Sequence, residues 1–278
     1  MSDIEYGLFR AKFIKPYQTS FLHEDLSPRD IFRRAINERP SAELIRDHIW
    51  HIGNIRSFSE YTGYFAIGRT TNATIEKYDT KSGDFVEETL ETSPYTHVVF
   101  DASIGLLGIA KKTRLAPSSK GIASKIEKLL SQTTVVIQND ISVEIAPVPD
   151  PEGFLRAIAS AYRVTRFTAT FSGPNPIDAD EIFQKPLSVY LAAANGDVGH
   201  TQVQGEDLNK ETIQEVARST AATGNQASAR ITRARFQKSI TINLAGDPVR
   251  RRYDEDGHDP ERVLHDLTAA FQRIRTSE

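Results

Sequence analysis

The stretch Thr96-His-Val-Val-Phe-Asp-Ala-Ser-Ile-Gly-Leu-Leu-Gly-Ile-Ala-Lys-Lys-Thr-Arg114 predicts the centre of the fold. Residues 96–100 and 104–110 are two nearly unbroken apolar runs with the length of β-strands, joined by a short turn. Strands that are apolar at every position usually lie in a sheet that is covered on both faces. The second run ends in Lys111-Lys112, so the sequence predicts a buried strand that leads directly into a basic segment.

Strand and helix signals continue on both sides of this hairpin. Ser27-Pro28 and Asp150-Pro151 each have the residue order of a helix start, a capping side chain followed by proline. Strands are predicted at residues 6–14, 64–69, 74–78, 85–90, 142–145, 164–171, 201–204, 227–234 and 239–244. Helices are predicted from Ser27 to Pro40, from Ser41 onward, from Ser118 or Ser119 to Leu130, from Asp150 to Ala159, over 178–183 with a continuation to Asn195, and over 207–220 and 260–275.

The segment Ala146-Pro-Val-Pro-Asp-Pro151 is the predicted domain boundary. Three prolines in five positions make it stiff and extended. The boundary at 147–151 separates an N-terminal lobe, residues 1–146, from a C-terminal lobe, residues 152–278. The order of the elements predicts an α+β protein with two lobes of mixed β-sheet and helices packed on the sheet faces.

The composition excludes several classes of site. The 278 residues contain no cysteine, which removes disulfides, thiolate nucleophiles and iron–sulfur clusters. No Gly-x-Ser-x-Gly elbow and no Walker A loop is present, and Gly105-Leu-Leu-Gly108 lacks the third glycine of a dinucleotide-binding loop. No cofactor is therefore expected. The sequence has neither a signal peptide nor an apolar run of membrane-spanning length, so a cytoplasmic protein is predicted.

Three patterns resemble metal or nuclease sites, and each has a simpler explanation. His48 and His51 could share a helix face, but on a strand they would point to opposite faces. The acidic run 254–259 fails the EF-hand spacing, and Asp259 suits a cap for the helix that follows. Asp101 and Lys111-Lys112 would lie near opposite ends of their hairpin. No metal site is predicted, and a metal-dependent nuclease is kept as an alternative.

Two basic islands stand out in a chain whose net charge is −3. Residues 102–125 carry a charge of +5 and residues 226–252 carry +6, which leaves −14 for the rest of the chain. Segregation of this kind is typical of a polyanion-binding surface. The candidate nucleic-acid-binding residues are Lys111, Lys112, Arg114, Lys120, Arg230, Arg233, Arg235, Lys238, Arg250, Arg251 and Arg252.

The local context of the two islands differs. In the first island, Lys111, Lys112 and Arg114 lead into the helix start at Ser118 or Ser119, whose free N–H groups could help to hold a phosphate. In the second, Arg233 and Arg235 alternate on a predicted strand and are expected to project from one face. Residues 250–252 are expected on a loop after the last strand.

The stretch 97–119, with Val143-Glu-Ile-Ala-Pro147 and Arg163-Val-Thr-Arg-Phe-Thr-Ala-Thr-Phe171, resembles the RexA phage-exclusion proteins of lambdoid prophages and their defence-associated relatives. The resemblance covers about residues 64–171. It implies a cytoplasmic, homodimeric, non-enzymatic DNA-binding sensor that acts with a second defence component, often a membrane effector. Lys111, Lys112 and Arg114 occupy the basic positions of the matching segment.

The sequence therefore predicts a protein that binds double-stranded DNA without strong sequence preference and serves as a sensor or regulator in anti-phage defence. Two alternatives remain open. One is the metal-dependent nuclease, and the other is a protein-interaction module whose basic islands meet an acidic partner.

Overall fold

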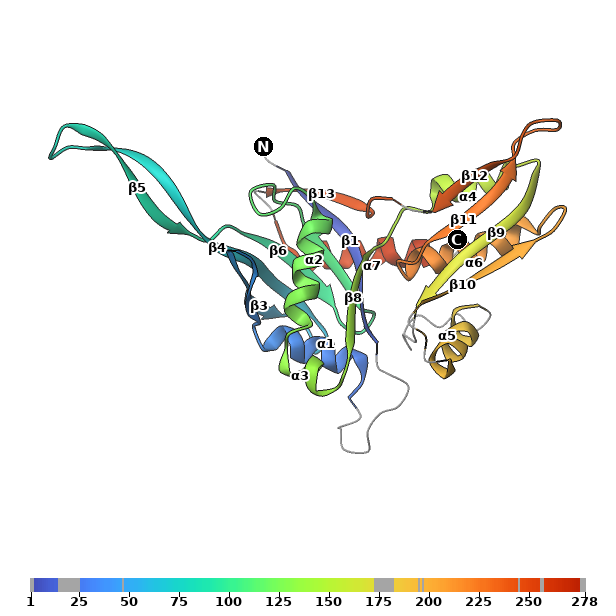
Figure 1. Cartoon of the computed structure of the whole chain (residues 1–278), viewed down its shortest axis with the longest axis horizontal. Coiled ribbons are helices and arrows are strands. Elements are labelled where there is room, and N and C mark those ends of the chain that lie inside the picture. The colour runs from blue at the N-terminus through green and yellow to red at the C-terminus, as the bar shows by residue number, and fades with distance from the viewer. Residues whose placement is uncertain are drawn as a thin grey trace.

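The computed structural model describes residues 3–14, 26–46, 48–172, 183–194, 196, 198–244, 246–255 and 258–275. Within these residues the chain forms two antiparallel sheets, of nine and four strands, with seven helices (Figure 1). The predicted α+β class is confirmed. Both sheets pair antiparallel throughout their described strands, where mixed sheets were expected. Most of the predicted helix over 178–183 lies outside the described residues.

The first sheet has the strand order β13-β1-β7-β6-β4-β3-β2, with β8 also paired to β1 and β5 to β4. Its strands are β1 (Asp3–Ile14), β2 (Ser41–Ile45), β3 (His48–Ser57), β4 (Thr62–Asp79), β5 (Asp84–Thr92), β6 (Tyr95–Asp101), β7 (Leu106–Ala110), β8 (Ser142–Pro147) and β13 (Arg250–Asp254). Beyond the body of the sheet, β4 and β5 continue together as a two-stranded arm (Figure 1).

Helices cover both faces of this sheet, as its apolar central strands predicted. On one face, α1 (Pro28–Asn37), α2 (Ser119–Leu130) and α3 (Thr134–Gln138) enclose a core that includes Phe9 and Ile109. On the other face, α7 (Pro260–Arg275) packs against β6 and β7 (Figure 1). Tyr6 and Leu8 point into this second core. Alternate residues of β1 thus serve two cores, which is the period-2 geometry of a strand covered on both sides.

The second sheet has the strand order β10-β9-β11-β12. Its strands are β9 (Arg163–Ser172), β10 (Val198–Gln204), β11 (Ala227–Thr232) and β12 (Ile240–Leu244), and its accompanying helices are α4 (Glu152–Ala159), α5 (Gln184–Ala193) and α6 (Lys210–Ala222). The predicted alternation of β9 is confirmed, because Phe167, Ala169 and Phe171 are buried. α6 packs against β9 and β11, and the intervening residues of those strands face away from it.

The C-terminal segment returns to the first sheet. β13 pairs with residues Asp3–Gly7 of β1, and α7 packs on that sheet as well as on α6. The predicted C-terminal lobe of residues 152–278 is therefore not a single structural unit. Its last part, β13 and α7, completes the first lobe, which is thus built from two separate segments of the chain. The two segments that link the lobes both pass Leu8 of β1. The Val148 N–H donates to the Leu8 carbonyl at 3.0 Å, and the Leu8 N–H donates to the Val249 carbonyl at 2.9 Å.

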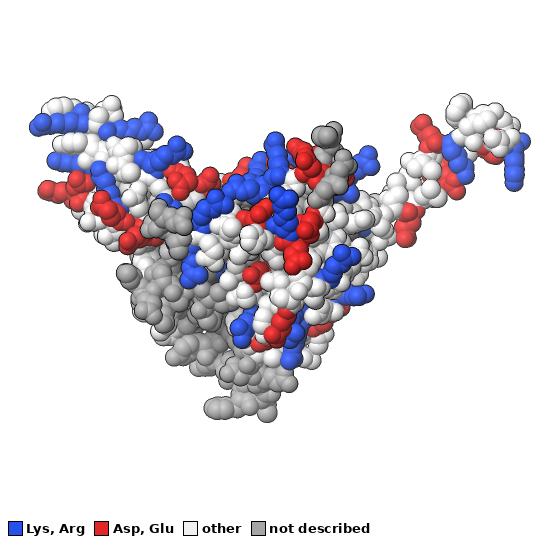
Figure 2. All heavy atoms as spheres, turned by 180° about the vertical axis from the view of Figure 1, so that it is seen from behind, with Lys and Arg blue, Asp and Glu red and all other residues white. Residues whose placement is uncertain are grey.

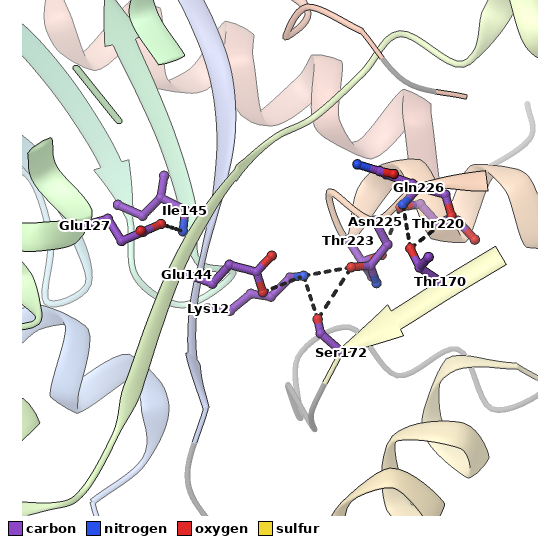
Figure 3. A network of polar contacts seen from close by, with 10 residues as sticks. All are labelled: Lys12, Glu127, Glu144, Ile145, Thr170, Ser172, Thr220, Thr223, Asn225 and Gln226. Atoms are coloured by element: carbon purple, nitrogen blue, oxygen red, sulfur yellow. Dashed lines mark hydrogen bonds and ion pairs between the residues drawn. The ribbon is translucent and has the colours of Figure 1, made fainter. Parts of the chain in front are cut away.

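A buried lysine joins the two lobes. Lys12 of β1 is only 2% exposed, and its Nζ donates to Ser172 Oγ at 2.8 Å and to Asn225 Oδ1 at 3.0 Å (Figure 3). Glu144 of β8 lies 3.4 Å from the same ammonium group. Ser172 and Asn225 belong to the second lobe, so the network ties its sheet to β1. A buried ammonium with carboxylate and oxygen partners avoids the desolvation cost of an unpaired charge.

Two local predictions are wrong. The segment from Ser41 was predicted as a helix, but it is the edge strand β2, paired with β3. Residues 64–69 and 74–78 were predicted as separate strands, but both belong to the 18-residue strand β4. In each case an adjacent strand supplies backbone partners that short-range residue patterns do not reveal. None of the described helices is long and apolar enough to cross a membrane.

Gly108 of β7 allows α7 to approach the sheet closely. A Cβ at this position would lie 2.3 Å from Leu267 Cδ1 and 2.7 Å from Val99 Cγ2. We therefore expect Gly108→Ala to destabilise the protein by about 1–3 kcal/mol through overpacking, as measured by chemical denaturation. Gly153→Ala in α4 is the matched control, because its Cβ would meet no atom within 4 Å. It should stabilise the helix by about 0.5–1 kcal/mol. Equal effects at both glycines would contradict the close packing at Gly108.

Candidate nucleic-acid interface

The first residues of β1 bring Lys111 of the first basic island close to residues 250–252, the end of the second. β7 pairs with one edge of β1, with Ala110 opposite Tyr6, so that the Lys111 N–H donates to the Glu5 carbonyl at 2.8 Å. β13 pairs with the other edge, with Arg252 opposite Glu5. Segments separated by more than 100 residues thus flank the same short piece of strand.

These segments line an open pocket of about 720 Å³. We call it the β1 site, and its residues are Asp3, Glu5, Lys111, Lys112, Thr113, Arg114 and Arg252. Four cations and two carboxylates therefore face one depression. Lys112 Nζ also lies 5.3 Å from the centre of the Tyr95 ring, within cation–π range.

Ion pairs organise the cations around this pocket. Glu5 lies 3.2 Å from Arg252 Nε and 3.7 Å from Arg250 Nη1. Asp247 lies 2.5 Å from Arg250 Nη2 and 3.3 Å from Lys120 Nζ. The arginine side chains are 46% and 70% exposed, so these pairs contribute little stability. Their main effect is to position the cations while neutralising part of their charge.

The expectation that residues 250–252 form a loop is wrong. They form β13, because β8 covers only residues Phe9–Ile14 of β1 and leaves the Asp3–Gly7 edge for another strand. Arg250 and Arg252 consequently share one face, beside Glu5. Arg251 lies opposite Tyr6, and its Nη1 donates to the Arg250 carbonyl at 3.3 Å.

The helix that begins within the first island, α2, starts where the sequence predicts. Ser118 is the N-cap of α2, and its Oγ accepts the Gly121 N–H at 3.2 Å. Lys120 in the first turn pairs with Asp247, as described above. The helix start therefore lies beside the second island rather than apart from it.

The remaining predicted residues lie on the second lobe. Arg230 is exposed on β11, but pairing with β12 ends at Ile231 and Ile240, and the chain then turns. Arg233, Arg235 and Lys238 occupy this turn, so the prediction that Arg233 and Arg235 share a strand face is wrong.

Phe236 at the turn has a positive φ of 67° and is 94% exposed, with Arg235 5.1 Å from its ring centre. Figure 2 shows Lys and Arg atoms along the upper edge of the molecule, over this turn and over the central region that contains β13.

The sequence did not reveal the acidic members of the β1 site. Asp3 and Glu5 lie about 250 residues from Arg252, and only strand pairing brings Glu5 opposite that arginine. The one available signal was the pair of acids at the start of a predicted strand.

The weaker metal and nuclease patterns are also located by the structure. His48 and Trp50 share one face of β3, whereas His51 points to the other and hydrogen-bonds Ser41 at 2.8 Å and Thr70 at 2.9 Å. Asp259 accepts the Glu261 N–H at 3.0 Å at the start of α7. Asp101 lies opposite Leu106, at the end of the hairpin remote from Lys111, as predicted. Among the described residues, no group of three or more His, Asp or Glu side chains could hold a metal ion.

Residues 25–230 match the family described as a domain of unknown function, DUF4747. The chain belongs to the DUF4747 family. The match contains the first island and Arg230, whereas β1, β13 and α7 lie outside it. Three of the seven residues of the β1 site in this DUF4747 protein, namely Asp3, Glu5 and Arg252, are thus supplied by segments that flank the matched region. No curated protein matches the chain.

Beside the β1 site, two histidines pack together between tyrosines. The ring centres of His97 and His258 are 5.2 Å apart. Tyr64 Oη lies 2.7 Å from His97 Nδ1, and Tyr6 Oη lies 2.6 Å from His258 Nε2. Burial raises the pKa of both tyrosines, so both phenols remain protonated at neutral pH and form a hydrogen bond with the adjacent imidazole nitrogen.

The same burial favours the neutral form of both histidines. Desolvation is the largest cause of the lowered pKa of His97, and His258 and Lys112 add repulsion. Desolvation also lowers the pKa of His258, against the opposing effect of Asp259 and Glu255. The unfolded chain binds more protons than the folded chain below pH ~6.5, the ordinary histidine pKa.

The melting temperature is therefore expected to fall as the pH decreases from 7 to 5.5. His97→Gln should flatten this dependence, because it removes one proton-binding group and the repulsion on the other. His265→Gln on α7, where the imidazole is 85% exposed, is the matched control and should preserve it. A wild-type melting temperature that rises over this range would contradict the neutral pair.

Proposed function

We propose that this protein binds double-stranded DNA through phosphate contacts, largely without sequence preference. The observation that carries the proposal is the convergence of Lys111, Lys112 and Arg114 with Arg252 in one open pocket. Lysine and arginine attract a phosphate backbone by long-range electrostatics and hold it by charge-assisted hydrogen bonds.

Two features of the interface favour backbone contact over sequence readout. No described helix projects from the β1 site in the manner of a recognition helix, since α2 is packed against β8. The cations are also exposed, with Lys111, Lys112 and Arg114 just past the end of β7 and Arg252 on β13 beside them, an arrangement that suits phosphates rather than base edges. The exposed turn at Phe236 adds a further contact for the same polymer.

The biological role that we propose is a non-enzymatic sensor or regulator in anti-phage defence. This part rests on the resemblance of residues 64–171 to the RexA group. By the same resemblance, we propose a cytoplasmic homodimer that acts with a second defence component.

The two alternatives remain distinguishable. A nuclease would use Asp101, whose carboxylate accepts the Ser103 N–H at 2.9 Å and lies at the other end of the β6–β7 hairpin from the basic cluster. An acidic protein partner would pair with the cations that Glu5 and Asp247 already hold. Mg²⁺-dependent cleavage that Asp101→Ala abolishes would favour the nuclease. Co-purification with an acidic protein, without retained nucleic acid, would favour the protein-interaction module.

The direct test is binding of an arbitrary 30-base-pair duplex, measured by fluorescence anisotropy at several salt concentrations. Affinity should fall steeply between about 50 and 200 mM salt. The slope of log affinity against log salt concentration should steepen by about 0.9 for each phosphate that the protein neutralises. Lys111→Gln with Lys112→Gln should reduce that slope by up to about 2.

The matched control removes two exposed lysines away from the β1 site. Lys81→Gln with Lys128→Gln changes the net charge equally, on the arm turn and on α2, and should leave the slope unchanged. Binding that does not depend on salt, or absence of binding at 50 mM salt, would refute the proposed function.

A further inference from the structure

Among the residues that the structure describes, the outward face of the four-stranded sheet carries arginines and no acidic residue. The register places every second residue of each strand on this face, away from α6. Val198 at the start of β10 also lies on it, and its exposed or half-buried polar residues are Arg166, Thr168, Thr170, His200, Gln202, Gln204, Ser228, Arg230, Thr232, Thr241 and Asn243. We call this surface the sheet face.

Two arginines stand directly opposite each other on it. Arg166 of β9 pairs with Arg230 of β11, and both side chains are exposed. Like charges in directly opposed positions destabilise a sheet. No described carboxylate forms an ion pair with either guanidinium, in contrast to Arg250 and Arg252 of the β1 region. The arrangement costs stability in the free protein, and an anion would relieve that cost.

The rest of the sheet face supplies neutral hydrogen-bonding groups. Thr168 Oγ1 donates to Gln202 Oε1 at 3.4 Å, and Gln204 lies opposite Arg166 on the neighbouring strand. Amides and hydroxyls of this kind bind phosphate and sugar oxygens. His200 provides the only ring among the residues of this face, so the surface lacks the aromatic side chains on which unpaired bases would stack.

We propose that the sheet face binds the phosphodiester backbone of a DNA duplex, with Arg166 and Arg230 as its central anion-binding pair. Neighbouring strands are about 4.8 Å apart, so the two guanidinium groups can approach one phosphate from adjacent strands. Positive charge continues from one end of this pair. Arg163, the exposed first residue of β9, lies opposite Thr232, and the turn Arg233–Lys238 follows β11 there.

This inference rests on the proposed function and deepens it, because it adds a second contact surface for the same polymer. The β1 site and the turn beside the sheet face both lie along the upper edge in Figure 2. A duplex held at the β1 site could therefore continue over the second lobe. The inference also assigns a role to Arg166, which lies outside both basic islands.

The test uses Arg166→Gln with Arg230→Gln in the full chain. DNA affinity at about 100 mM salt should fall at least about tenfold, and the salt slope should decrease by up to about 2. The melting temperature should stay equal or rise, since the substitution removes like-charge repulsion without creating a buried gap. Loss of affinity in a variant that is at least as stable as the wild type separates binding from folding. Arg166→Lys with Arg230→Lys should retain most of the affinity.

Arg262→Gln with Arg273→Gln on the exposed side of α7 is the charge-matched control, and it should bind like the wild type. If the wild type binds the duplex and the sheet-face variant binds equally well, the sheet-face inference is overturned and the proposed function stands. If the wild type binds no duplex, both fail. If polyglutamate binds the sheet face as tightly as DNA does, the surface is one for an acidic protein and the inference is again overturned.

Discussion

The structure depends on the pairing of β1 along both of its edges. One edge carries β7, whereas the other is divided, with β13 on Asp3–Gly7 and β8 on Phe9–Ile14. The division falls at Leu8, where Val148 and Val249 meet the strand and each other. Every backbone group of a buried strand needs a partner, and here three segments from distant parts of the chain supply the partners. That requirement draws the C-terminal segment back to the N-terminus and places Arg250 and Arg252, at the end of the second island, beside Glu5, whose carbonyl accepts the Lys111 N–H.

The same strand links the two cores. Its alternate side chains enter the core under α1 and α2 and the core under α7, and Lys12 reaches from it to Ser172 and Asn225 in the second lobe. A buried lysine of this kind is costly if its partners are lost. The position of the second lobe relative to β1 is thus specified by directional hydrogen bonds as well as by apolar contact. This matters for function because the proposed duplex contacts both lobes.

The two basic regions differ in how their charge is balanced. Around the β1 site, Glu5 and Asp247 hold Arg250, Arg252 and Lys120 in place, which gives a positioned but partly neutralised cluster. On the sheet face, no carboxylate of the described part of the chain pairs with Arg166 or Arg230. The first arrangement suits a site that is ordered before it binds. The second suits a surface that gains stability from its ligand, since the ligand removes a repulsion present in the free protein.

The sequence by itself determined the local elements whose signals are short-range. The hairpin at residues 96–110, the cap at Ser118, the alternation of β9 and the helix over 260–275 were all predictable, because periodicity and capping chemistry depend on neighbouring residues. The tertiary structure alone decided that residues 41–45 and 250–252 form strands, that Arg233 and Arg235 lie on a turn, and that Glu5, Arg252 and Lys111 share one site. Strand pairing over some 250 residues leaves no local pattern, since β13 pairs with Asp3–Gly7 through backbone groups that β8, on Phe9–Ile14, leaves unpaired.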